Sequence, residues 1–343
     1  MIKRRAFMSA LVACAAAVGL SHGAAAQEKK FFTMDSLPAG SGPGQLSIAF
    51  SQVVQKHLPY EIQISIGKPA TKSAVDAAKG QVDFFLSATG INHYMQTQSA
   101  MFAKVNNAKE LNSKLRLIMN YPIGPFHVVV YEESGITSMK DLKGKKVFLG
   151  PPAGAATKVA MQFVEGATGL KPGEDFEVMR YDWQSAETAF LDKQMDAYMI
   201  PTTLPSPVIQ QFALVSNIRL LSIPDDAWDN EVMQKMLEVP GRTPTTIPAG
   251  SYENQVNTED VTTVTGWVGL GVGSHVNDED VYRMTKAFWE NIDEVHQTAP
   301  WMKVFKRDTI FTEANLPLHV GAYRYYREIG WAVPDDLVPP EAK

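Results

Sequence analysis

The chain has 343 residues, of which 45% are hydrophobic and 20% charged, a composition that suits about two globular domains with a large buried core. Lys and Arg number 32 against 37 Asp and Glu, and no stretch combines clustered basic residues with interleaved aromatic residues, so we expect no nucleic-acid partner. The single cysteine, Cys14, lies in the N-terminal segment, which excludes a disulfide framework, thiolate metal ligands and a cysteine nucleophile from the rest of the chain.

Residues 1–26 have the three parts of an export signal. The basic start Lys3–Arg5 is followed by an apolar run of about 15 residues and by the small residues Ala24–Ala26. Because this run is shorter than the ~20 residues that a spanning helix needs, we expect a signal peptide cleaved after Ala26 and a periplasmic protein. The Arg4-Arg5 pair leaves both the Sec and the twin-arginine route open, and Leu11–Cys14 leaves lipidation at Cys14 open as well.

The first part of the chain after this segment predicts a β-α-β-α-β unit. A strand begins at Phe31, and a loop rich in Gly and Pro at 36–44 leads into a helix. Apolar residues at helical spacing predict the buried stripe of that helix, Leu46, Ala49, Phe50, Val53 and Val54. Strands at 62–66 and 82–86 follow, with a short helix at 71–78 between them.

The same order of elements returns later in the chain. A strand at 146–149 is followed by a Gly- and Pro-rich loop and by a helix with the stripe Val159, Ala160, Phe163 and Val164. A strand at 176–179, a helix capped by Ser185 and a strand at 197–200 complete the repeat. Gly40 and Gly154 each precede the next predicted strand by 22 residues, which indicates one architecture used twice.

This alternation predicts an α/β fold with two lobes, each a mainly parallel sheet flanked by helices. Apolar, β-rich stretches at 115–119, 126–131 and 261–272 predict strands that cross between the lobes. We therefore assign residues 27–130 to the first lobe, 131–260 to the second, and 261–343 to a strand that returns to the first lobe and its closing helices. Such sheets bind ligands at the carboxyl ends of their strands, so the site is expected in a cleft between the lobes.

The two Gly-rich loops are candidate anion sites, because a helix N-terminus presents unpaired N–H groups and a positive dipole end. Ligand contacts expected from the first lobe are Ser36, Gly40, Ser41, Gly42, Gly44, Gln45, Thr71, Thr89 and Asn92. Those expected from the crossing strand and the second lobe are Phe126, Gly154, Ala155, Ala156, Thr157, Trp183, Thr202 and Thr203. The alternatives are ordinary turn chemistry for the glycines and core packing for Phe126 and Trp183.

No familiar catalytic pattern is present. The stretch 40–45 does not fit the dinucleotide fingerprint, 150–158 lacks the Gly-Lys of a phosphate loop, and there is no Gly-x-Ser-x-Gly. The seven histidines have no metal-ligand spacing, and Asp83 and Asp196 open strands at their amino ends, away from the expected cleft. We therefore expect no catalytic residue, no metal and no cofactor, and a protein that is not an enzyme.

Several longer stretches carry a resemblance to one family. They are "SGITSMKDLKGKKVFLGPPAG" (134–154), "SAETAFLDKQMDAYMI" (185–200), "LPSPVIQQFA" (204–213), "IRLLSI" (218–223), "TIPAGSY" (246–252) and "LPLHVGAYRYYREIG" (316–330). Together they resemble the solute-binding proteins of TRAP transporters of the TAXI type. The resemblance covers nearly all of the chain after the export segment.

The resemblance implies a periplasmic-binding-protein type II fold, a small organic anion as ligand and the membrane permease of a TRAP transporter as partner. We expect a monomer that closes two lobes around its ligand. The two glycine loops and the stretch Lys68–Ser73 depart from the pattern usual in the family, where hydroxyl groups are more frequent. Three alternatives stay open: the binding component of an ATP-driven importer, an exported α/β enzyme, and a sensor subunit for a membrane kinase.

Overall fold

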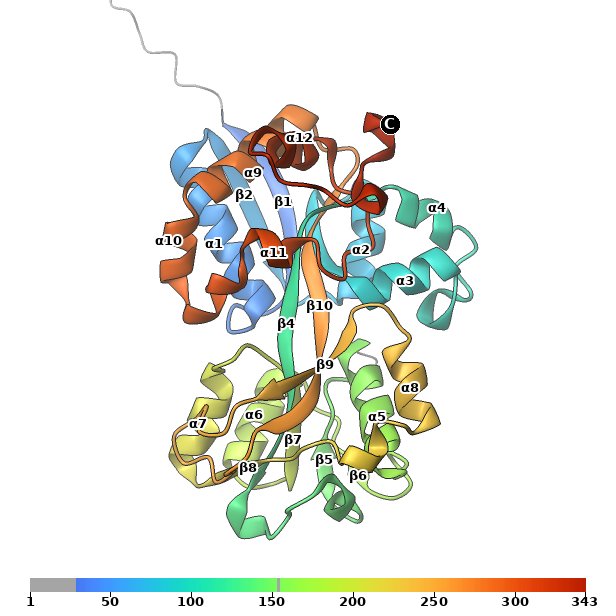
Figure 1. Ribbon diagram of the computed structural model, residues 1–343, viewed down its shortest axis with the longest axis vertical. Coiled ribbons are helices and arrows are strands. Elements are labelled where there is room, and N and C mark those ends of the chain that lie inside the picture. Colours follow the sequence, from blue (N-terminus) through green and yellow to red (C-terminus); the bar gives the residue numbers. More distant parts are fainter. Residues whose placement is uncertain (1–28, 153–154) are drawn as a thin grey trace, which may run out of the picture.

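Two long strands run through both lobes of the molecule and join them (Figure 1). They are β4 (Leu115–Tyr131) and β10 (Val261–Gly273), which pair in antiparallel register. The structure, a computed structural model, describes residues 29–152 and 155–343. The expected export segment and Gly154 therefore lie outside the described residues. In the described ranges no helix is long and apolar enough to cross a membrane.

The first lobe contains both the beginning and the end of the described chain (Figure 1). Its N-terminal elements are β1 (Lys30–Ser36), α1 (Gly42–His57), β2 (Tyr60–Ile66), α2 (Ala70–Ala78), β3 (Phe84–Ala88), α3 (Thr89–Thr97) and α4 (Ala108–Ser113). Its C-terminal elements are α9 (Asp278–Glu290), α10 (Ile292–Thr298), α11 (Arg307–Ile310) and α12 (Val320–Glu328). One apolar core, which includes Phe50, Phe84 and Phe288, unites the two sets.

The second lobe is formed by the middle of the chain. Its elements are β5 (Lys146–Phe148), α5 (Ala155–Thr168), β6 (Glu177–Val178), α6 (Trp183–Leu191), β7 (Ala197–Pro201), α7 (Pro207–Val215), β8 (Ile218–Leu220), α8 (Glu231–Leu237) and β9 (Arg242–Ile247). Helices cover both faces of its sheet, and two separate apolar cores lie beneath them, one around Phe163 and one around Tyr198.

The sheet order confirms the predicted fold class. The strands follow the order β2-β1-β3-β10-β4-β7-β5-β6, with β8 beside β4 and β9 beside β10. Pairs β1–β2, β1–β3, β5–β6 and β5–β7 are parallel, whereas every pair that involves a crossing strand is antiparallel. Each lobe thus has a sheet whose own strands are parallel, joined by the antiparallel crossing strands, and the strand that returns from the second lobe lies inside the sheet of the first, as a type II binding-protein fold requires.

Helix α1 illustrates how the local sequence builds an element. Ser41 is its N-cap, and its Oγ accepts a hydrogen bond of 3.2 Å from the N–H of Gly44, while Pro43 fits the first turn because its missing N–H is not needed there. The predicted stripe of Leu46, Ala49, Phe50, Val53 and Val54 is buried, as expected. Burying this apolar face against the sheet stabilises the helix more than its intrinsic propensity does.

Three predicted details were wrong. The cap of α6 is Asp182, whose Oδ1 accepts a hydrogen bond of 2.8 Å from the N–H of Ser185; Ser185 itself lies in the first turn. Strand β3 covers Phe84–Ala88, two residues later than predicted, because its pairing with β10 extends to Ala88. The stretches 115–119 and 126–131 belong to one strand of 17 residues, since pairing with β10 continues past a register shift at Ile123 to Pro125, where pairing with β7 begins.

Asp83 and Asp196 have the structural role that their positions predict. Oδ2 of Asp83 accepts a hydrogen bond of 2.8 Å from the N–H of Thr33 in β1, and Oδ2 of Asp196 accepts one of 2.7 Å from the N–H of Lys146 in β5. The donor precedes the acceptor by 50 residues in both lobes. The repeated architecture inferred from the sequence is therefore present down to individual hydrogen bonds.

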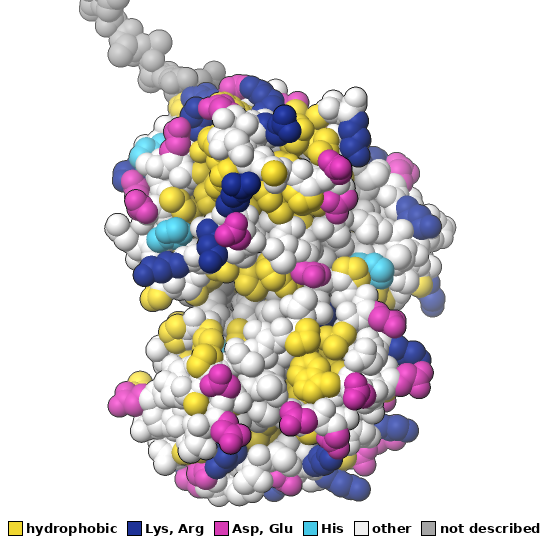
Figure 2. Space-filling model, in the orientation of Figure 1, with side chains coloured by type: hydrophobic (Ala, Val, Ile, Leu, Met, Phe, Trp, Pro, Cys, Tyr) yellow, Lys and Arg dark blue, Asp and Glu magenta, His cyan; other side chains and the backbone are white. Residues whose placement is uncertain are grey.

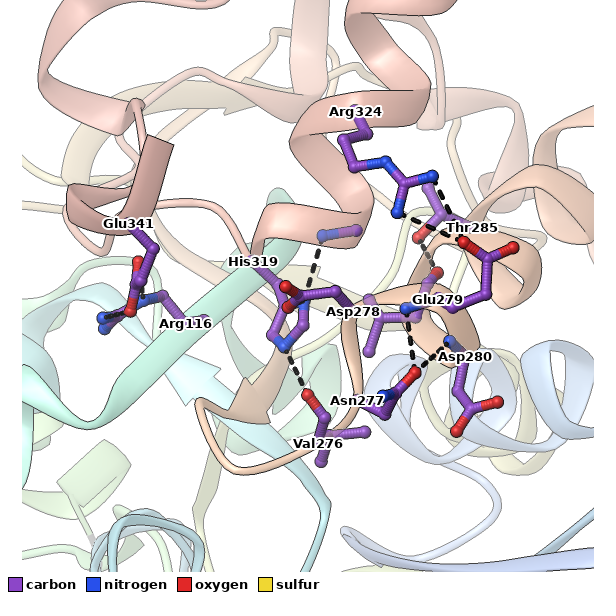
Figure 3. Close-up of polar contacts among 12 residues, drawn as sticks. Arg116, Val276, Asn277, Asp278, Glu279, Asp280, Thr285, His319, Arg324 and Glu341 are labelled. Atoms are coloured by element: carbon purple, nitrogen blue, oxygen red, sulfur yellow. Dashed lines mark hydrogen bonds and ion pairs between the residues drawn. The ribbon is translucent and has the colours of Figure 1, made fainter. Parts of the chain in front are cut away.

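Polar contacts fasten the C-terminal helices to the first lobe (Figure 3). His319 caps α12: its Nδ1 accepts from the N–H of Gly321 at 3.2 Å, and its Nε2 donates to the carbonyl oxygen of Val276 at 3.0 Å. Burial lowers the pKa of His319, which keeps the ring neutral in this role. Arg116 on β4 pairs with Glu341 near the C-terminus.

Candidate functional site

The two lobes touch on both sides of the crossing strands. We call the region that contains these contacts the interlobe junction and define it by Gly42 and Thr89 of the first lobe and Thr203 and Gly241 of the chain beyond β4. The space-filling view shows a furrow between the lobes at this level (Figure 2). Helices α1 and α3 begin at the junction, as the rule for parallel sheets predicts.

The first contact lies at the N-terminus of α1. A methyl group placed at Gly42 would lie 3.0 Å from Cγ2 of Thr203 and 3.7 Å from the ring of Trp301. Nε1 of Trp301 donates a hydrogen bond of 2.6 Å to Oε1 of Gln45, and its ring packs beside Tyr121 at 5.9 Å between centroids. The backbone of Gly42, the side chain of Thr203 and the ring of Trp301 therefore lie together at this point of the junction.

The second contact lies at the N-terminus of α3. Gly241 has a φ of +81°, and a methyl group there would lie 2.6 Å from Cβ of Thr89, so only glycine allows this close approach. The N–H of Gly241 donates to Oε2 of Glu313 at 2.9 Å, and the hydroxyl of Thr89 donates to the carbonyl oxygen of Glu313 at 3.1 Å. The first turn of α3 is covered by the segment that leads into β9.

Arg242 reaches elements of both lobes from the start of β9. Its Nη2 donates to the hydroxyl of Tyr94 on α3 at 3.0 Å, and its Nη1 donates to Oε1 of Gln162 on α5 at 3.1 Å and to the carbonyl oxygen of Met236 at 3.2 Å. Burial lowers the pKa of this guanidinium, and the nearby Tyr94 hydroxyl acts in the opposite direction.

A buried hydrogen-bond network supports the loop that carries Thr202 and Thr203. Nδ1–H of His127 donates to the carbonyl oxygen of Pro125 at 2.9 Å, so Nε2 accepts from the hydroxyl of Tyr252 at 2.7 Å. That hydroxyl accepts in turn from the N–H of Ser206 at 3.1 Å. Complete burial lowers the pKa of His127 to about 4, and burial also raises the pKa of Tyr252. Both groups are therefore neutral near pH 7.

The residues predicted in the first glycine loop lie close together. Gly42 is part of the junction, Ser41 caps α1, and Gln45 is one turn further along the same helix. Gly40 is exposed at the tip of the loop, whereas Ser36 is buried beneath α1, where its hydroxyl lies 2.8 Å from that of Ser47. These positions as ligand contacts stay predictions.

The other predicted residues of the first lobe are more spread out. Thr89 is 2% exposed and engaged with Glu313, and Asn92, also 2% exposed, donates to Ser87 and Asn315. Thr71 lies in the first turn of α2, which follows β2 at the same carboxyl edge of the sheet from which α1 and α3 begin. Lys68, in the stretch that departs from the family pattern, is paired with Asp35 at 3.1 Å.

In the second lobe, Thr202 and Thr203 lie in the loop after β7, where the N–H of Thr202 donates to Pro125 at 3.2 Å. The hydroxyl of Thr157 donates to the carbonyl oxygen of Pro151 at 2.7 Å, so it closes the turn before α5. Phe126 and Trp183 pack against the aromatic side chains of the two apolar cores, the alternative considered from the sequence. Of the other ligand contacts predicted here, Ala155 and Ala156 lie in the first turn of α5. Gly154 lies outside the described residues.

The sequence did not predict three side chains of the junction, Arg242, Trp301 and Glu313. They lie outside the two repeated units or deep within an element, so no loop motif marks them. Trp301, in a short 3₁₀ helix at Pro300–Val304, and Glu313 come from the C-terminal segment. Glu313 stands out only by its positive φ of 54°, and a backbone angle cannot be read from the sequence.

Comparison with known proteins places the chain in a family. The profile of the NMT1-like family matches residues 47–330. A protein of Brucella abortus (strain 2308) named "Putative binding protein" is 33% identical over 86 residues. The match covers 25% of this chain and 26% of the length of that curated relative. A Brucella suis protein of the same description shows the same values.

Solved structures that are similar to this chain are more distant in sequence. The periplasmic aliphatic sulphonate binding protein of Escherichia coli is 14% identical, covers 90% of each chain and has a TM-score of 0.44. A TRAP periplasmic solute binding protein of Ralstonia eutropha H16, with bound (S)-2-acetolactate, is 10% identical, covers 90% of this chain and 87% of that one, and has a TM-score of 0.45. Since the family profile extends from the first helix to the end of α12, the chain belongs to the NMT1-like family.

Proposed function

We propose that the protein is an exported solute-binding protein that captures a small organic anion at the interlobe junction and delivers it to the membrane permease of a TRAP-type secondary transporter, as the TAXI-like sequence stretches imply. It acts as a monomer in the periplasm and makes no covalent change to its ligand. Its ligand contacts come from the loop before α1, from the start of α5 and from the loop after β7.

The observation that carries this proposal is the pair of interlobe contacts on both sides of two crossing strands. Gly42 meets Thr203 on one side, and Gly241 meets Thr89 on the other. The register of β4 against β10 shifts next to Gly124, whose φ is +113° and whose Cβ would lie 1.9 Å from the carbonyl oxygen of Thr202. Two lobes joined by two strands can open and close, and a ligand that contacts both lobes favours the closed arrangement.

The chemistry of the junction favours binding over catalysis. Its described side chains are threonine hydroxyls, aromatic rings, one guanidinium and one carboxylate, with backbone N–H groups between them. His127, which supports the Thr202 loop through Tyr252, already uses both ring nitrogens and is fully buried. A micromolar affinity needs about −8 kcal/mol, which several charge-assisted hydrogen bonds in a desolvated cleft can supply.

A thermal-shift screen of organic acids, amino acids, sulfonates and neutral solutes tests the proposal. A true ligand at 100 times its Kd stabilises the folded state by about 2.7 kcal/mol and raises Tm. Small-angle scattering with the same ligand is expected to report a smaller radius of gyration. Unchanged Tm and radius with every solute, or the appearance of a chemically altered product, would contradict the proposal.

A matched pair of variants locates the binding event. Gly42→Val places a branched side chain against Thr203, where a single methyl group already lies at 3.0 Å, so closure and ligand binding are expected to fail. Ala103→Val, at an exposed position of the first lobe outside the junction, should bind normally. Equal binding by both variants would place the ligand elsewhere.

A further inference from the structure

Arg242 differs from three other arginines of the described chain in what accepts its hydrogen bonds. Arg116, Arg219 and Arg324 each form an ion pair with a glutamate. Among the described residues no carboxylate lies within ion-pair distance of Arg242, whose acceptors are a phenol hydroxyl, a side-chain amide and a backbone carbonyl. A partly buried guanidinium that has only neutral partners keeps an uncompensated charge, which is costly in a desolvated site.

The guanidinium also has unused donors. It carries five N–H groups, and the described partners take two on Nη1 and one on Nη2. Within the described part of the chain, Nε–H and the second N–H of Nη2 have no acceptor. Arg219 shows what these two nitrogens can do: its Nε and Nη2 hold the two carboxylate oxygens of Glu132 at 3.0 and 2.9 Å. The same geometry at Arg242 suits an oxyanion from outside the chain.

The position of Arg242 links such an anion to both lobes. Its three hydrogen bonds hold the guanidinium between Tyr94 on α3 and Gln162 on α5, and the preceding Gly241 forms part of the interlobe junction. Fixed in this way, the side chain loses little further entropy when it binds a ligand. An anion bound there adds a charged contact at the point where the lobes meet.

We propose that Arg242 is the residue that recognises the charged group of the ligand, and that this group is an oxyanion, a carboxylate or a sulfonate, bound by Nε–H and Nη2–H. The inference rests on the proposed function and deepens it, because it names the residue and the ligand chemistry. Tyr94 and Gln162 are then positioning residues, which orient the guanidinium without contacting the ligand.

The test uses the purified protein and four variants, with acetate, methanesulfonate, inorganic sulfate and every solute from the thermal-shift screen as probes at constant ionic strength. Arg242→Gln removes the charge, Arg242→Lys keeps it without the two-donor edge, and Tyr94→Phe removes the link to α3. Arg327→Gln, an exposed arginine on α12, is the control for a general loss of charge. Isothermal titration measures each Kd.

For anionic ligands, we expect Arg242→Gln to weaken binding at least tenfold, Arg242→Lys to weaken it less, and Tyr94→Phe to change it less than threefold. Arg327→Gln should bind like the unmodified protein, and ligand affinity should fall with added salt unless Arg242 is replaced. If Tyr94→Phe and Arg242→Gln weaken charged and neutral solutes equally, Arg242 only latches the lobes together, and the inference is wrong.

Two further outcomes separate this inference from the function beneath it. If solutes bind and Arg242→Gln leaves every Kd unchanged, solute binding stands but the oxyanion site is elsewhere. If no probe or solute binds the unmodified protein, the proposed function and the role of Arg242 are both overturned. Circular dichroism of each variant shows whether a lost affinity reflects a lost fold.

Discussion

The buried histidine behind the Thr202 loop should make the protein sensitive to mild acid. His127 is fully buried, and burial lowers its pKa from an ordinary value near 6.5 to about 4. Between these two values the unfolded chain binds a proton at this ring and the folded chain does not. Stability from His127 is therefore complete above about pH 6.5 and is lost as pH falls toward 4.

The size of the effect follows from the same shift. A change of one pKa unit corresponds to about 1.4 kcal/mol, so a shift of this size is worth about 3 kcal/mol in total. Because the unfolded ring titrates first, about 2 kcal/mol of this should already be lost between pH 7 and pH 5. His319 has a lowered pKa too and adds a loss in the same direction.

His127→Phe isolates the contribution of this ring. The variant keeps an aromatic side chain but leaves the Tyr252 hydroxyl without its acceptor, so we expect it to be about 1–3 kcal/mol less stable at pH 7. The free energy of unfolding is measured by urea denaturation at pH 7, 6 and 5. The difference between the two proteins should shrink by about 2 kcal/mol over this range, because only the unmodified protein loses the His127 term. Parallel pH profiles would refute the assigned protonation state.

Three further substitutions test the local structure by thermal unfolding. Gly44→Ala places a methyl group 2.1 Å from a backbone oxygen and should cost about 1–3 kcal/mol, whereas Gly40→Ala, which meets no atom within 4 Å, should cost much less; similar costs would contradict the packing of the loop. Asp182→Ala removes the cap of α6 and should lower Tm more than Ser185→Ala, and the reverse order would reinstate the serine as cap. Asp196→Asn weakens an accepted N–H bond at the start of β5 and should reduce stability by about 1 kcal/mol with no change in ligand affinity; a changed affinity would place this residue at the site.

Local pattern was sufficient for the elements and for their repetition. The stripe from Leu46 to Val54 predicted α1, because apolar residues at helical spacing have one face to bury. The 22-residue spacing after Gly40 and Gly154 predicted a second lobe like the first, and the equivalent hydrogen bonds of Asp83 and Asp196 confirm it. The wrong cap at Ser185 shows where pattern is weak, since serine and aspartate cap about equally well and both occur near the start of α6.

What the amino-acid sequence determined by itself is thus the α/β architecture and the two loops from which helices α1 and α5 begin. Only the tertiary structure decided that Arg242 lies between Tyr94 and Gln162, that Glu313 binds the N–H of Gly241, and that Gly42 faces Thr203. The physical reason is the range of the interactions. Periodicity and capping act within a few residues, whereas the junction is assembled by residues far apart in the chain that meet because two strands carry it from one lobe to the other and back.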